Sequence, residues 1–127
     1  MYYFTTIIEE DFDEAIEKVT AALAEEGFGI LTQIDVTATL KKKIGADFRP
    51  YRILGACNPP FAYKALSAED KIGTMLPCNV VVQVNEEGRT EVTAVDPQAS
   101  MAAVENNELA GIAGEIRRKL RNVITSL

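Results

Sequence analysis

Apolar residues recur along the chain with two periods, and these periods predict alternating strands and helices. Residues 2–8 and 28–34 are rich in aromatic and β-branched side chains, which favour strands. Asp11 is placed to cap a helix between them, with Glu14 at the capping-box spacing, and Gly27 is placed to end it. The helix has one apolar face, formed by residues spaced at three and four positions: Phe12, Ile16, Val19 and Leu23.

The rest of the chain continues this alternation and ends in a hairpin followed by a long helix. The pattern predicts these further elements: a helix over 36–44, a strand over 51–57, a helix opened by Asn58-Pro59-Pro60, a strand over 76–84, a hairpin connection at 85–88, a strand over 89–96, a short helical segment after Asp96-Pro97, and a final helix after 106–107. This order predicts an α+β fold: a two-layer sandwich with a mostly antiparallel sheet backed by helices.

Size and composition are those of a globular chain. The 127 residues and 13.9 kDa suit a single domain over 1–127, and 47% of the residues are hydrophobic and 25% charged. No apolar run is long enough to cross a bilayer, and the N-terminus lacks the basic and small-residue features of a signal peptide. We therefore expect no membrane partner and a cytoplasmic location, where the two cysteines would stay free thiols.

Charge and residue types narrow the function classes. The net charge of −6 argues against a nucleic-acid partner, and the basic clusters at 41–43 and 117–121 fit solvated helix faces. The chain has no histidine, which excludes Ser-His-Asp and Cys-His catalysis and histidine-ligated metals. We expect no metal site; Cys57 and Cys78 are the only thiol ligands, and two thiolates would suit a soft ion such as Cu(I).

The most informative feature is a repeated Cys-Asn step, Cys57-Asn58 and Cys78-Asn79, each beside a proline. Cys57 ends a predicted interior strand just before a helix, where the helix dipole favours a thiolate, although cysteine is more often a buried apolar residue. Cys78 shares its strand face with valines and is expected to point into the core. Asn58 is expected to cap the helix; alternatively, both asparagine amides line a polar pocket.

Three segments carry a resemblance to a known family: Gly27-Phe28-Gly29, Leu54-Gly55-Ala56-Cys57-Asn58-Pro59 and Leu76-Pro77-Cys78-Asn79-Val80-Val81-Val82. Across essentially the whole chain, the sequence resembles the bacterial and archaeal family called domain of unknown function 302. The resemblance implies a fold similar to the TATA-binding-protein type and a homodimer. It brings no established reaction, substrate or catalytic residue, and the cofactor stays unknown. Its motif positions become site candidates: Cys57, Asn58, Pro59, Pro77 and Cys78, to which the repeated step adds Asn79.

Two functions compete. The first is a dimeric binding or accessory module, rather than an enzyme, that holds a small molecule or a protein partner in a pocket near the Cys-Asn steps. The alternative is thiol chemistry in redox, sulfur-handling or soft-metal transfer, with Cys57 as the reactive thiolate and Cys78 as a second thiol. A plainer interpretation is that the cysteines and prolines only stabilise the fold.

Overall fold

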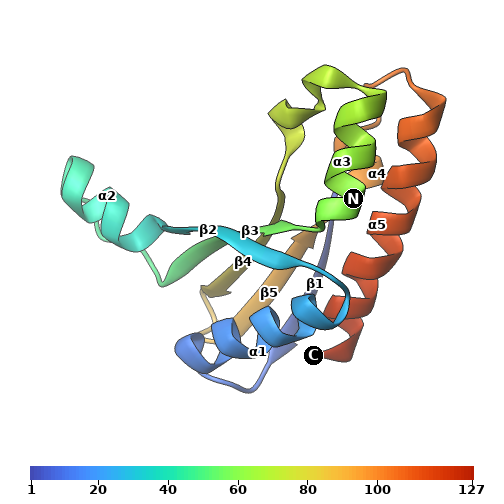
Figure 1. The fold of residues 1–127 in the computed structure, drawn as a ribbon. Coiled ribbons are helices and arrows are strands. Elements are labelled where there is room, and N and C mark those ends of the chain that lie inside the picture. Colours follow the sequence, from blue (N-terminus) through green and yellow to red (C-terminus); the bar gives the residue numbers. More distant parts are fainter.

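A computed structural model describes residues 1–127 and contains one five-stranded sheet with helices packed against it (Figure 1). The strand order is β1-β5-β4-β3-β2, and every neighbouring pair is antiparallel. The elements in chain order are β1 (Tyr3–Ile8), α1 (Phe12–Glu25), β2 (Gly29–Asp35), α2 (Val36–Ile44), β3 (Tyr51–Cys57), α3 (Pro59–Ala68), the 3-10 helix η1 (Asp70–Met75), β4 (Cys78–Val84), β5 (Thr90–Val95), α4 (Pro97–Ser100) and α5 (Asn107–Ser126).

The first helix forms where the sequence predicts it. The carboxylate of Asp11 accepts a hydrogen bond from the backbone N–H of Glu14 at 2.9 Å, which satisfies one of the free N–H groups of the first turn. Gly27 follows the helix with a φ of 85°, a conformation that glycine adopts without steric cost. Helix α1 then leads from one edge of the sheet to the other, because β1 and β2 are the two edge strands.

Helices α1 and α5 bury their apolar faces against the same face of the sheet, and the main core lies between the two layers. Leu54, Val80 and Val92 come from the three central strands, while Val19 and Leu120 come from the two helices; all five are fully buried. The fold class predicted from the sequence, a two-layer α+β sandwich with an antiparallel sheet, is confirmed.

The other face of the sheet carries no helix. A row of paired residues crosses it from edge to edge: Ile34, Ile53, Val81, Thr93 and Thr5. Helix α2 extends away from the body of the molecule with the ends of β2 and β3, and none of its residues is buried (Figure 1).

Strand β4 begins at Cys78, two residues later than the sequence pattern predicts. The pairing of Ala56 with Cys78 is the last in the β3–β4 ladder, and Pro77 has no N–H with which to extend it. Residues 76 and 77 therefore form a connection from η1 into the sheet. No helix of the chain has both the length and the apolar character needed to cross a membrane.

Candidate functional site

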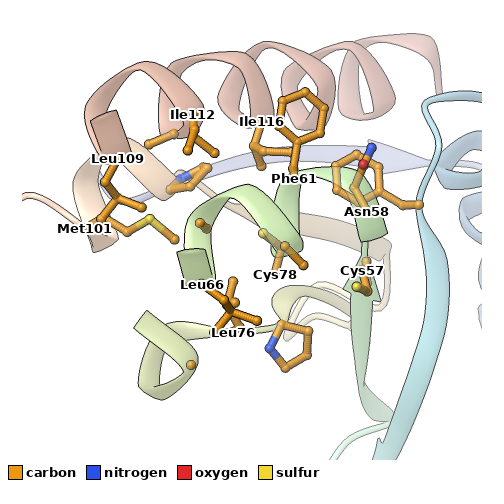
Figure 2. A pocket seen from close by; sticks show the side chains of 18 of the residues that line it. Cys57, Asn58, Phe61, Leu66, Leu76, Cys78, Met101, Leu109, Ile112 and Ile116 are labelled. Carbon is orange, nitrogen blue, oxygen red and sulfur yellow. The ribbon is translucent and has the colours of Figure 1, made fainter. Parts of the chain in front are cut away.

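A cavity of about 310 Å³ lies between the sheet and the helical segments at the end where β3 stops and β4 starts (Figure 2). Fifteen of its 19 lining residues are hydrophobic, and none is charged. Helix α3 and helix α5 form two walls, and the β3 and β4 ends form the base. The side chains that surround it are Phe28, Leu31, Ala56, Cys57, Asn58, Phe61, Ala62, Ala65, Leu66, Leu76, Pro77, Cys78, Pro97, Met101, Leu109, Ile112, Ala113 and Ile116, together with Gly73.

Chain order explains why a cavity forms here. Strand β3 runs directly into α3, and η1 returns the chain to the neighbouring strand β4, so residues 59–77 arch over the ends of two adjacent strands. Three of the wall residues contributed by helices are alanines, namely Ala62, Ala65 and Ala113. Their small side chains leave volume between α3 and α5 that larger residues would fill.

The two cysteines both border this cavity. Ala56 pairs with Cys78, so Cys57 lies one residue beyond that pair and diagonal to Cys78; both cysteines are free thiols. Cys78 is buried, whereas Cys57 is half-buried. Burial raises the pKa of the Cys78 thiol to about 11, and the nearby Cys57 acts in the same direction. At neutral pH Cys78 is therefore an uncharged part of the apolar wall.

Asn58 does not cap α3 with its side chain, which corrects the sequence prediction. The side chain of a capping residue accepts from the second or third N–H of the helix, and Pro60 at the second position has no N–H. The Asn58 amide instead turns toward the end of α1, where its Nδ2 donates to the backbone carbonyl of Glu26 at 3.3 Å. Gly27 lies against it, since a Cβ on Gly27 would be 3.0 Å from Nδ2. The amide thus joins the end of α1 to the end of β3.

The prolines and the second asparagine are placed differently. Pro77 borders the cavity and packs against Gly55, because a Cβ on Gly55 would lie 2.8 Å from its Cγ. Pro59 is exposed at the start of α3, and Asn79 is exposed on β4; neither borders the cavity. The structure therefore places Cys57, Asn58, Pro77 and Cys78 around one space and leaves Pro59 and Asn79 outside it.

Three of the four basic residues of α5 are held by contacts within the chain. The Nε of Arg117 lies 3.1 Å from the carboxylate of Asp96, and the Nζ of Lys119 lies 3.8 Å from that of Glu26. Arg121 lies over the ring of Phe4, 5.8 Å from its centroid. None of these cations borders the cavity.

The helical side of the cavity was missed by sequence reasoning. None of the candidate residues named from the sequence lies on the final helix or on the segment after Asp96-Pro97, yet Ile112, Ile116 and Met101 line the cavity. The signal that could have found this side is the occurrence of alanines on both α3 and α5, together with an asparagine followed by two prolines at the start of α3.

The fold and the cavity together define a small α+β protein with an uncharged apolar cavity at one end of its sheet. The chain belongs to the family described as domain of unknown function DUF302, whose model matches residues 4–127. It is similar to the crystal structure of an uncharacterized conserved protein of this family from Bacillus stearothermophilus, with 33% identity and a TM-score of 0.91 over 98% of this chain and 97% of that one. No curated protein matches the chain.

The motif segments behind the family resemblance are separated in sequence and meet at the cavity. Phe28, Cys57, Asn58, Leu76 and Cys78 all line it, and they come from the three segments quoted for the resemblance. This convergence links the motif to one place in the fold.

Proposed function

We propose that the protein is a non-enzymatic binding module, folded as one domain over 1–127, that holds a small apolar ligand in the cavity between the β3–β4 end, α3 and α5. The observation that carries the proposal is the cavity itself, at about 310 Å³ with 15 hydrophobic residues among 19. A dry apolar cavity of roughly 150 Å³ is large enough to bind benzene, so this one has room for a ligand of about twice that size. Its volume is also at the lower end of known ligand pockets.

The chemistry of the lining supports binding over catalysis. General acid–base catalysis needs a titratable group within reach of the substrate, and no carboxylate, lysine or arginine borders the cavity. The buried thiol of Cys78 has its pKa raised to about 11 and is a poor nucleophile at neutral pH. Apolar area and shape are what the site offers a ligand.

The test is binding of uncharged aromatic compounds, measured by thermal unfolding and by titration calorimetry. At a ligand concentration 100 times Kd, binding should raise the unfolding free energy by about 2.7 kcal/mol. The variant Ala62→Leu narrows the cavity and should weaken binding, whereas Ala21→Leu, an exposed position on α1, should bind like the wild type. The absence of binding by every uncharged apolar compound of this size contradicts the proposal.

A second candidate function is thiol chemistry at the same place. It is favoured by one observation: Cys57 and Cys78 are both free and both border the cavity. The half-buried Cys57 would be the reactive group in redox, sulfur-handling or soft-metal transfer, and Cys78 the second thiol.

Alkylation rates as a function of pH separate the two functions. A reactive Cys57 should be modified quickly in the native state well below pH 8.5, and Cys57→Ser should abolish this reaction. Modification that needs a pH near 8.5 or unfolding would assign Cys57 a structural role. In that case Cys57→Ser should change stability alone.

We also propose that the chain forms a homodimer in the cytoplasm through the helix-free face of its sheet. Ile7 and Ile34 are 38% and 48% exposed on this face, and Ile44 of the projecting α2 is 72% exposed. Light scattering should give twice the chain mass of 13.9 kDa, and Ile34→Glu should reduce it to a single chain. A monomeric mass for the wild type at tens of micromolar refutes the dimer.

A further inference from the structure

The cavity contains one amide oxygen with no partner in the chain, and this atom indicates what kind of ligand fits. Asn58 is only 8% exposed, and its Nδ2 donates to the carbonyl of Glu26 at 3.3 Å. A carbonyl oxygen can only accept, so the NH₂ end of the amide must face Glu26. The Oδ1 end is therefore fixed on the other side and accepts no hydrogen bond from any group of the protein.

The free Oδ1 remains reachable by a ligand. Every fully buried side-chain nitrogen and oxygen of the protein has a hydrogen-bond partner. Oδ1 of Asn58 has none, so this oxygen is not fully buried and keeps some accessible surface. Asn58 borders the cavity, where it is the only residue with a polar side-chain nitrogen or oxygen (Figure 2). Among the side chains that line this space, Asn58 thus supplies the one strong acceptor, and the others are apolar apart from two thiols.

On the basis of the function proposed above, we propose that the ligand is an uncharged molecule with a single hydroxyl group on an aromatic or aliphatic body about twice the size of benzene, and that this hydroxyl donates to Oδ1 of Asn58. A donor is required because Oδ1 can only accept. A ligand without a donor would cover this oxygen and leave it unpaired, which is costly, so a ligand that supplies the donor is favoured over one of equal size that does not.

Charged ligands are disfavoured by the same lining. A carboxylate would be buried without any cation to pair with it and would face the lone pairs of Oδ1. An ammonium group would find a single acceptor and no carboxylate in the lining. Among the lining side chains, a second hydroxyl would find only thiols, which are weak hydrogen-bond partners.

The anchor is held rigidly by its surroundings. Gly27 leaves little free space beside the amide, since a Cβ added to it would lie 3.0 Å from Nδ2. The backbone carbonyl of Asn58 accepts the first helical hydrogen bond of α3 from the N–H of Ala62 at 2.9 Å. The side chain and the backbone of Asn58 are thus fixed to two different elements. A fixed acceptor loses little freedom on binding and discriminates between ligands by geometry.

Four compounds of nearly equal size test the inference at pH 7 with the full wild-type chain: 2-naphthol, naphthalene, 2-methoxynaphthalene and 2-naphthoate. Dissociation constants are measured by calorimetry or by naphthyl fluorescence. We expect 2-naphthol to bind about 10-fold more tightly than naphthalene and 2-methoxynaphthalene, as one buried hydrogen bond provides. We expect 2-naphthoate to bind at least 10-fold more weakly than naphthalene.

A pair of variants locates the effect. In Asn58→Leu, 2-naphthol should lose its advantage and bind like naphthalene. In Asn79→Leu, the matched change at the exposed asparagine of the second Cys-Asn step, the 10-fold advantage should remain. If Asn58→Leu does not fold, the comparison of the four compounds on the wild type decides alone.

The results distinguish a failure of the hydroxyl anchor from a failure of the proposed apolar binding function. Equal affinities for 2-naphthol, naphthalene and 2-methoxynaphthalene overturn the hydroxyl anchor while the apolar binding function stands. Preferential binding of 2-naphthoate overturns it as well, because the site would then accept an anion. If none of the three uncharged compounds binds, both the inference and the proposed function are wrong.

Discussion

Filling the cavity with a larger side chain gives a direct measure of its free volume. Ala62 is half-buried on α3 and lines the cavity, so Ala62→Leu directs three additional carbons toward unfilled space. Burial of three carbons provides about 2.4 kcal/mol at roughly 0.8 kcal/mol each. Ordering the leucine side chain costs about 0.5–1 kcal/mol. We therefore expect the unfolding free energy to rise by about 1–2 kcal/mol.

The assay is urea denaturation of wild type and variant under the same conditions. A higher midpoint at an unchanged slope reports greater stability without a change in the surface exposed on unfolding. The control is Ala21→Leu, which makes the same replacement at an exposed position of α1 and should change the unfolding free energy by less than about 0.5 kcal/mol. The control removes the small effect of helix propensity from the comparison.

The sign of the change decides whether the reasoning holds. Inserting methylenes into a well-packed region costs about 1–3 kcal/mol, because neighbours must move or adopt strained rotamers. A loss of more than 1 kcal/mol in Ala62→Leu would show that α3 and α5 already fill the space between them. A more stable variant that has lost affinity for 2-naphthol, by contrast, shows that leucine and ligand occupy the same volume.

Two further changes test the base of the cavity. Gly55→Ala should lower the unfolding free energy by about 1–3 kcal/mol, because its Cβ would collide with Oγ1 of Thr32 and lie 2.8 Å from Cγ of Pro77. The control is Gly29→Ala, which has nothing within 4 Å of its Cβ. It should be neutral or slightly stabilising in the same denaturation assay. Between pH 9 and 11 the unfolded state loses the thiol proton of Cys78 that the folded state keeps, so stability falls as pH rises through this window. The stability of the wild type relative to Cys78→Ala should therefore fall by about 2 kcal/mol over this window, and a constant difference would contradict the raised pKa.

Elements set by neighbouring residues could be predicted from the sequence. The cap at Asp11 depends on a residue three positions away, and the end of α2 depends on Gly45 itself, which has a φ of 67°. Strand β3 occupies the predicted range 51–57 because its apolar residues and its flanking prolines are local signals. Periodicity also predicted the layers, since one apolar face on each helix requires a sheet face to cover it.

Asn58 shows where local reasoning fails. An asparagine before two prolines is typical of a helix cap, but its side chain bonds to Glu26, 32 positions earlier in the chain. No spacing rule connects these residues, because their contact depends on where α1 ends relative to β3. The prediction was wrong about the hydrogen bond of this amide. The alternative was that both asparagine amides line a polar pocket; the structure places Asn58 at an apolar cavity and Asn79 outside it.

The cavity itself could not be predicted, because its volume depends on how two helices distant in sequence pack against each other. The sequence indicates which residues lie at the ends of β3 and β4, but not the separation of α3 from α5. Larger residues beside the alanines contribute to that separation, including Ile72 and Leu109, which form a buried cluster with Ala65. A small-residue face predicts either close helix contact or unfilled volume, and only the tertiary structure decides between them.

The two sides of the cavity therefore contribute different things to binding. The sheet side is fixed by specific contacts, with Asn58 held by Glu26 and Gly27, and Pro77 packed on Gly55. The helical side supplies apolar area without a polar side-chain nitrogen or oxygen. Affinity for a ligand should then come mainly from the helical side and choice among ligands from the amide oxygen. This division explains why a cavity-filling change on α3 should weaken all ligands alike, whereas a change at Asn58 should affect only those that donate a hydrogen bond.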